Sequence, residues 1–260
     1  MSNNDETKNV ENWTIESNVG RLRSQLLQAE IDLTHPDRGI VAMQLAGRRQ
    51  MGARLQLSCR AEESTQSAPA WSADLVDAYV RGHDLVASYS GTDAWPYSPT
   101  VYWSADSTAP GCSDHASLSL LVSIQTDLLD TRPRLFVCSS LPADEVLMVT
   151  VVDDDLVVDS HGEGEQAVDP RASACGLVWR LPGETVSYVE IMPATDFHNF
   201  SIDRNSNTIG SRWELFGEFL EKGVIRRARL QSLFVPREDD VQLAAEACQS
   251  IEGRPLPLTT

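Results

Sequence analysis

The stretch LQAEIDLTHPDRGIVAMQL, residues 27–45, carries the pattern that decides the fold. From Leu27 to Leu33 every second residue is apolar and the residues between are polar, which is the two-residue period of a strand with one buried face. The segment 35–39 contains proline and glycine, which supply a turn, and apolar character resumes over 40–45. Residues 27–45 are therefore predicted to form a β-hairpin.

Strand-like segments of the same kind recur along most of the chain, separated by turn residues. They cover residues 54–59, 75–80, 84–89, 100–103, 117–125, 134–139, 146–152 and 156–158. Two later pairs of segments are joined by short turns and are predicted as further hairpins. These pairs are 176–181 with 186–192, and 213–220 with 224–235.

One segment has the spacing of a helix. Apolar residues recur at three- and four-residue steps from Val241 to Ile251, and Gly253 followed by Pro255 is a typical stop. The sequence therefore predicts an all-β, mainly antiparallel fold, a large β-sandwich or supersandwich with one C-terminal helix near 239–251. A disordered tail is expected over residues 1–12 and a single β-sandwich domain over 13–260.

The charge of the chain restricts its partners. There are 38 acidic and 21 basic residues, for a formal net charge of −17. Phosphate backbones and anionic lipid surfaces would be repelled, so neither a nucleic-acid nor a membrane partner is expected. The longest apolar runs are also far shorter than the roughly 20 residues of a membrane-spanning helix, and residues 1–12 have no signal-peptide core.

The five cysteines are scattered and form no C-x-x-C pair, which argues against a zinc site and a disulfide framework. A cytoplasmic protein fits this cysteine usage. Cys138 and Cys175 lie in apolar runs and are predicted to be reduced and buried. The run Asp153–Asp155 lacks the spacing of a calcium loop and is interpreted as a charged turn. No metal and no cofactor is predicted, because nucleotide-loop motifs are missing as well.

Two clusters are candidates for a ligand site. In WPYSPTVYW, residues 95–103, Trp95 and Tyr97 are predicted to be exposed aromatic platforms for a sugar, whereas Trp103 is predicted to be buried in a strand. A core position for all of these rings is the alternative. Upstream, Arg81 is a candidate donor to a sugar or carboxylate and His83 a candidate acid or base, the alternative being a solvated turn.

A third cluster lies at the end of the strand 186–192. Glu190 and His198 are the kinds of group that general acid/base catalysis requires, and both are candidate catalytic residues. Asp196, Phe197 and Asn199 adjoin His198. Hydrogen bonding at the surface is the alternative interpretation for the pair, because eight residues separate its members.

The run of strands, the turn Pro182-Gly183-Glu184 and the scattered His, Glu and Trp residues resemble the galactose mutarotase-like supersandwich group, over about residues 13–236. The resemblance implies a large antiparallel sandwich that binds sugars on a broad concave sheet. Many members are aldose 1-epimerases that use a histidine acid and a glutamate base. Here the family's histidine pair cannot be placed, since no motif surrounds His83, His115, His161 or His198. Glu190 and Glu214 are the candidates for the base, and Trp213 and Glu214 complete the ligand-binding candidates.

The leading functional hypothesis is a carbohydrate-binding or carbohydrate-modifying protein, with an aldose 1-epimerase-like isomerase as the activity if the chain is an enzyme. The alternative is a non-enzymatic protein-interaction or assembly module, in which Trp95, Tyr97 and Trp103 anchor a core or an interface. The hypothesis of a metal-dependent enzyme is supported only by the acidic turns.

Overall fold

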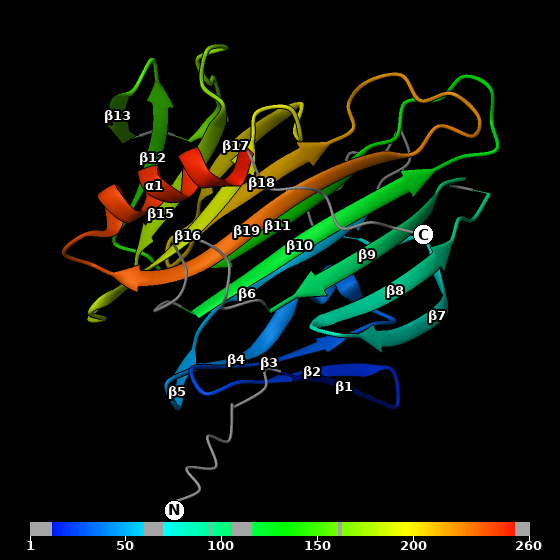
Figure 1. Cartoon of the computed structure of the whole chain (residues 1–260), viewed down its shortest axis with the longest axis horizontal. Helices are drawn as coiled ribbons and strands as arrows, with labels where there is room; N and C mark the ends of the chain where they lie inside the picture. The colour runs from blue at the N-terminus through cyan, green and yellow to red at the C-terminus, as the bar shows by residue number, and fades with distance from the viewer. Residues whose placement is uncertain (1–11, 60–69, 94, 106–115, 161–162, 253–260) are drawn as a thin grey trace, which may run out of the picture.

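The computed structural model describes residues 12–59, 70–93, 95–105, 116–160 and 163–252, and these form two large antiparallel sheets packed face to face (Figure 1). The predicted all-β sandwich with one C-terminal helix is confirmed. The predicted tail, except for Asn12, lies outside the described residues. No helix among the described residues is long and apolar enough to cross a membrane.

The first sheet has ten strands in the order β1-β2-β3-β4-β6-β11-β18-β17-β14, with β5 beside β4. Its strands are β1 (Asn12–Glu16), β2 (Val19–Arg23), β3 (Leu27–Asp32), β4 (Ile40–Leu45), β5 (Arg48–Gln50), β6 (Ala53–Cys59), β11 (Leu135–Leu141), β14 (Gly164–Gln166), β17 (Asn199–Arg204) and β18 (Ile209–Leu215).

The second sheet has nine strands in the order β13-β12-β15-β16-β19-β10-β9-β8-β7. Its strands are β7 (Asp74–Arg81), β8 (Asp84–Ser90), β9 (Ser98–Ser104), β10 (Ala116–Gln125), β12 (Glu145–Val152), β13 (Asp155–Ser160), β15 (Ala174–Arg180), β16 (Val186–Pro193) and β19 (Arg226–Pro236).

From β10 onward the chain crosses repeatedly between the two sheets. Strands β11, β14, β17 and β18 belong to the ten-stranded sheet, whereas β12, β13, β15, β16 and β19 belong to the nine-stranded sheet. The predicted hairpin of β15 with β16 is confirmed. The predicted hairpin of 213–220 with 224–235 is wrong, because β18 pairs with β11 and β17 while β19 pairs with β10 and β16. The turn residues between β18 and β19 therefore lie in a connection between the sheets.

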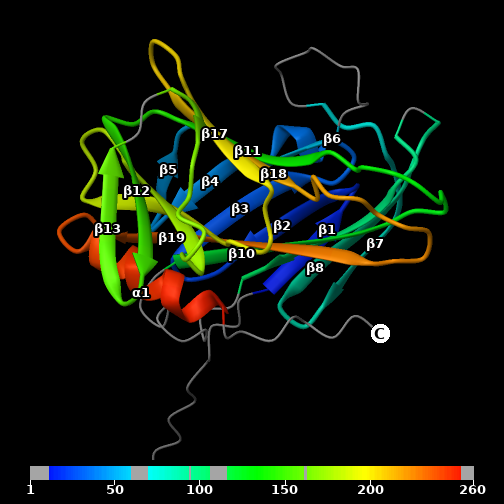
Figure 2. The ribbon, with the colours of Figure 1, turned by 90° about the horizontal axis from the view of Figure 1, so that it is seen from above.

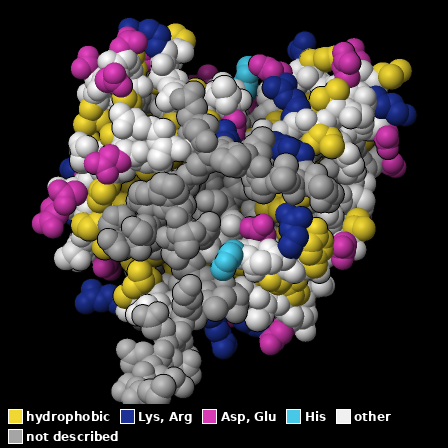
Figure 3. Space-filling view, viewed as in Figure 1, with side chains coloured by type: hydrophobic (Ala, Val, Ile, Leu, Met, Phe, Trp, Pro, Cys, Tyr) yellow, Lys and Arg dark blue, Asp and Glu magenta, His cyan; other side chains and the backbone are white. Residues whose placement is uncertain are grey.

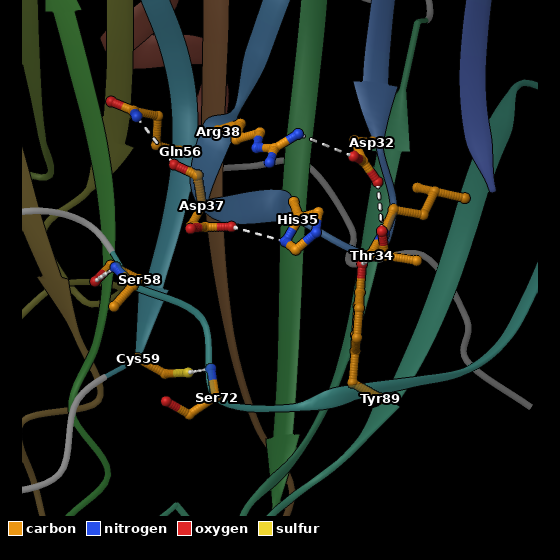
Figure 4. Close-up of polar contacts among 12 residues, drawn as sticks. Asp32, Thr34, His35, Asp37, Arg38, Gln56, Ser58, Cys59, Ser72 and Tyr89 are labelled. Carbon is orange, nitrogen blue, oxygen red and sulfur yellow. Dashed lines mark hydrogen bonds and ion pairs between the residues drawn. The ribbon is translucent and has the colours of Figure 1, made fainter.

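The opening hairpin is confirmed, since β3 pairs with β4 from Leu27–Leu45 to Ile31–Ile40. Its turn contains a short 3-10 helix (Pro36–Arg38) followed by Gly39, whose φ is +63°. A Cβ at Gly39 would collide with the backbone of β6, so only glycine fits. The Tyr89 hydroxyl of β8 donates to the Leu33 carbonyl at 2.9 Å, which ties this turn to the other sheet (Figure 4).

The main core lies between the sheets and contains the aromatic loop. Trp103 is fully buried, as predicted, but the predicted exposure of Trp95 and Tyr97 is wrong, since their exposed fractions are 1% and 7%. Trp95 packs 4.9 Å from Tyr97 and 6.2 Å from Trp71, between ring centroids, and Trp71 in turn packs against Tyr89. Pro96 lies outside the strands, whereas Pro99 is the second residue of β9, and the rings of Trp95 and Tyr97 both face inward.

The helix α1 (Asp240–Glu252) covers part of the outer face of the nine-stranded sheet, where it packs on β12, β15 and β16 (Figure 1, Figure 2). Its apolar face forms a second cluster that includes Ala244 and Cys248. The described cysteines are free, and Cys175 is fully buried as predicted. Cys138 is only partly buried, because it lies on the outer face of the ten-stranded sheet and not in the core.

Truncation of either tryptophan is expected to destabilise the fold strongly. Trp95→Ala and Trp103→Ala should each lower the free energy of unfolding by about 3 to 5 kcal/mol, because each removes a buried ring and leaves a cavity. Urea denaturation of the two variants measures this, with the exposed Tyr79→Ala as control. A loss of about 0.5 kcal/mol or less for Trp95→Ala would instead place its ring at the surface.

Candidate functional site

Glu190 lies on β16 and is fully buried between the sheets. Its carboxylate accepts hydrogen bonds from the Tyr188 hydroxyl at 3.1 Å, the Trp213 indole at 3.0 Å and the Ser211 hydroxyl at 3.2 Å. It also accepts one from the Ser139 hydroxyl. Ser139, Ser211 and Trp213 belong to β11 and β18, so this one carboxylate joins the nine-stranded sheet to the ten-stranded sheet.

These contacts correct two of the predicted roles. Glu190 satisfies its oxygens inside the core, whereas His198 is exposed just before β17, so the structure does not bring the predicted catalytic pair together. Trp213 is fully buried and stacks on Phe200 with a centroid distance of 4.6 Å. Its indole is therefore a core group and not a platform for a ligand.

A second buried charge, Arg54 on β6, lies beside this network. Its guanidinium is 5.0 Å from the centre of the Tyr188 ring, and its Nη1 donates to the Met51 carbonyl at 3.0 Å. Nε and Nη2 have no hydrogen-bond partner within the part of the chain that the structure describes. Burial lowers the pKa of Arg54, and the nearby Tyr188 and Glu190 oppose that shift. Burial likewise raises the pKa of Glu190, against the effect of its four donors.

The strands of the ten-stranded sheet that contact Glu190 carry mostly polar rows of side chains on their other face, which points away from the core. Because successive residues of a strand face opposite sides, the neighbours of Ser139, Ser211 and Trp213 point outward. One row crosses β6, β11, β18 and β17, and a second row beside it extends to β14. The first row is Ser58, Phe136, Glu214 and Asn199; the second is Gln56, Cys138, Arg212, Ser201 and Glu165.

The centre of these rows is the outer patch, which we define as Arg134, Phe136, Asn199, Arg212 and Glu214. The Arg134 Nε donates to a Glu214 carboxylate oxygen at 2.7 Å. Both guanidiniums lie over the Phe136 ring, with carbon-to-centroid distances of 5.3 Å for Arg134 and 5.5 Å for Arg212. The ring and the ion pair hold the arginines in place, which gives a fixed set of donors and one carboxylate acceptor.

A hollow of about 350 Å³ adjoins the outer patch at Asn199. Its lining includes Gln166, Asp169, Phe197 and His198. The backbone N–H of His198 donates to the Glu214 carbonyl at 2.7 Å, so the chain places His198 directly beside β18. The hollow falls in the size range of small-ligand pockets.

The remaining predicted residues lie elsewhere. Arg81 and His83 flank the turn between β7 and β8, at the free edge of the nine-stranded sheet, where Arg81 is 4.0 Å from the Asp84 carboxylate. Trp95 and Tyr97 are in the core. Of the eight predicted residues, only Glu214 and His198 therefore lie together near an outward-facing polar surface.

Sequence reasoning missed the residues that surround Glu214. Arg134 and Phe136 lie in a segment predicted as strand, and Arg212 directly precedes another, but alternation alone does not reveal which strands become neighbours. A charged residue at every second position of one strand, as at Arg212 and Glu214 of β18, is the signal that points to such a face. Among the described residues, no group of three or more His, Cys, Asp or Glu side chains could hold a metal ion.

The two-sheet layout resembles that of the galactose mutarotase-like supersandwich group, as the sequence resemblance implied. No family model matches the sequence, and no curated protein matches it. A putative aldose 1-epimerase from Klebsiella pneumoniae superposes with a TM-score of 0.55 at 7% identity, over 93% of this chain and 87% of that one. At this identity the likeness shows the fold alone.

Two further solved structures give the same result. A putative aldose 1-epimerase from Escherichia coli K12 has a TM-score of 0.52 at 8% identity, over 86% of this chain and 100% of that one. A GH36 alpha-galactosidase from Geobacillus stearothermophilus has a TM-score of 0.53 at 10% identity. There the alignment covers 86% of this chain but only 41% of the galactosidase, so this chain corresponds to part of that enzyme.

The buried carboxyl of Glu190 should make stability depend on pH in a defined direction. A carboxyl whose pKa is raised by folding contributes most to the free energy of unfolding at pH values below its ordinary pKa of 4.5. There it is protonated in both the folded and the unfolded protein. As the pH rises through the raised pKa, wild type should lose stability relative to Glu190→Gln, which cannot ionise. Urea denaturation of both proteins across this pH range measures the difference, with the exposed Glu30→Gln as control. If the wild type instead became more stable relative to Glu190→Gln as the pH rises, that result would contradict a raised pKa.

Proposed function

We propose that this chain binds a carbohydrate on the outer patch, with the ligand extending into the adjoining hollow. The observation that carries the proposal is the convergence of one carboxylate, two guanidiniums and an amide on the outward face of β11, β17 and β18. The side chain of Glu214 is 8% exposed and that of Arg134 is 45% exposed, so the ligand reaches the carboxylate from the side of the arginine.

The chemistry of the patch suits a polyol. Sugar hydroxyls both donate and accept hydrogen bonds, so they pair with the carboxylate of Glu214 as acceptor and with the guanidiniums and the Asn199 amide as donors. Groups that are already held in place lose little freedom on binding, which favours affinity. Ser201, in the neighbouring row, has a buried hydroxyl with no hydrogen-bond partner among the described residues. Such a group is a further candidate contact for a ligand hydroxyl.

The fold supports a carbohydrate ligand without identifying it. Solved structures that share the fold are described as putative aldose 1-epimerases and as an alpha-galactosidase, all of which are names of sugar-acting proteins. Because one fold serves many functions, the ligand is argued here from the outer patch, and the fold adds to that argument by analogy.

Binding, and not epimerisation, is the proposed activity. An epimerase of this class needs an acid and a base that face the same sugar ring. Glu190 is enclosed in the core, and Glu214 is the one carboxylate of the outer patch. His198 adjoins it through the backbone, and no contact between the two side chains supports their use as a pair.

A sugar that occupies the outer patch should raise the melting temperature of the wild type. A ligand present at about 100 times its Kd adds about 2.7 kcal/mol to the free energy of unfolding. Thermal-shift measurements with millimolar D-galactose, D-glucose and their common disaccharides test this. Glu214→Gln should abolish the shift, because it removes the charge that accepts sugar hydroxyls and holds Arg134.

The matched control is Glu30→Gln, which breaks the ion pair of Arg21 with Glu30 (2.9 Å) on the outer face of the same sheet. This variant should keep the full sugar-dependent shift. A wild type that no sugar of the panel stabilises would contradict the proposal, as would a Glu214→Gln variant that responds like wild type. Polarimetry of freshly dissolved D-galactose checks the activity, and acceleration that disappears in Glu214→Gln would add catalysis to binding.

A further inference from the structure

Two loops at one end of the sandwich form an exposed apolar surface, which we call the tip. The loops connect β10 with β11 and β18 with β19, and they project together at the right of the view in Figure 1 and again in Figure 2. The tip consists of five large hydrophobic residues with exposed fractions between 43% and 78%. They are Leu128, Leu129, Phe219, Val224 and Ile225.

Hydrogen bonds join the two loops into one unit. The Leu220 N–H donates to the Thr131 carbonyl at 2.8 Å, and the Thr131 hydroxyl donates back to the Leu220 carbonyl at 2.9 Å. The Gly223 N–H donates to the Thr126 carbonyl at 3.2 Å, and the Thr126 hydroxyl donates to the Pro96 carbonyl at 3.1 Å. The backbone of the tip is therefore anchored to the body of the protein.

The apolar content of the tip is unusual for this chain. Fourteen large hydrophobic side chains are exposed in the part of the chain that the structure describes, and five of them lie here. Contiguous exposed apolar surface with a polar rim is typical of a protein-protein or ligand interface. The space-filling view shows hydrophobic side chains beside both basic and acidic ones at this corner (Figure 3).

The rim of the tip carries both signs of charge, although the chain as a whole is strongly acidic. The charged residues of the two loops and their ends are Asp127, Asp130, Arg132, Arg134, Glu218, Glu221, Lys222 and Arg226. Four of these eight are basic, and two of the four form ion pairs within the chain, Arg134 with Glu214 and Arg226 with Glu218. A rim of mixed sign suits a surface that meets its own copy across a two-fold axis, because acidic groups of one copy can then oppose basic groups of the other.

We infer that the tip is the contact through which two copies of this chain associate as a two-fold dimer. Leu129 and Ile225, exposed to 78% and 52%, form the centre of that contact. Gly217 and Glu218 of the loop between β18 and β19, with Arg226 at the start of β19, also line a small hollow together with His198. Association at the tip would therefore hold in place a loop that lies next to the hollow of the proposed sugar site. The association itself does not depend on sugar binding.

The oligomeric state in solution tests this inference. Light scattering after size-exclusion chromatography, from low micromolar to several hundred micromolar protein, should show wild type approaching twice the chain mass of 28.6 kDa. The double variant Leu129→Asp, Ile225→Asp should keep the single-chain mass at every concentration. Its melting temperature, measured where wild type is also a single chain, should be unchanged, because both side chains are exposed.

Val76→Asp is the matched control, since Val76 is 66% exposed on β7, away from the tip, and it should dimerise like wild type. A wild type that stays at the single-chain mass would overturn the inference, as would a double variant that still dimerises. A single-chain wild type that co-sediments with phosphatidylcholine vesicles would instead assign the tip to a lipid surface. The sugar-dependent thermal shift of the double variant is measured separately, so failure of the dimer and failure of sugar binding are distinguishable.

Discussion

The carboxylate of Glu190 is the contact on which the alignment of the two sheets depends. A buried carboxyl without partners would cost several kcal/mol, and here four donors surround it, three of which come from the opposite sheet. The bonds require Ser139, Ser211 and Trp213 to face inward at one level of the sandwich. A slip of either strand by one residue would turn these groups outward and leave Glu190 unsatisfied. Tyr188, which lies under the guanidinium of Arg54, connects the second buried charge to the same centre.

The hydrogen bonds around Glu190 also determine which side chains the outer face of the ten-stranded sheet presents. Since Ser211 and Trp213 face the core, Arg212 and Glu214 must face outward, and the register of β11 with β18 then places Phe136 beside Glu214. The rows of the outer patch are therefore a consequence of the contacts made inside. This explains how a sheet in a strongly acidic protein holds two arginines over one aromatic ring, in a fixed position beside a single carboxylate. The strands that carry the proposed ligand site are held in place by the hydrogen bonds that their inward-facing residues make to Glu190.

Local patterns in the sequence predicted much of the fold and little of the site. The hairpin of β3 with β4, the pair β15 and β16 and the helix α1 follow from residues close together in the chain. The pairing of β11 with β18 joins distant segments, and nothing in either segment specifies the partner. Turn residues at 221–223 suggested a hairpin, but the flanking strands enter different sheets. Glu190 was a candidate catalytic residue because alternation in a strand does not reveal which of its polar residues is enclosed in the core.

One NMR titration directly tests the division of this protein into a structural interior and a binding exterior. The indole N–H signals of the tryptophans report on the core, while the Nε–H signals of Arg134 and Arg212 report on the outer patch. Addition of a sugar that stabilises the protein should shift the signals of Arg134 and Arg212 and leave those of the buried Trp95, Trp103 and Trp213 in place. Shifts confined to the indoles, with both arginine signals unmoved, would contradict the account.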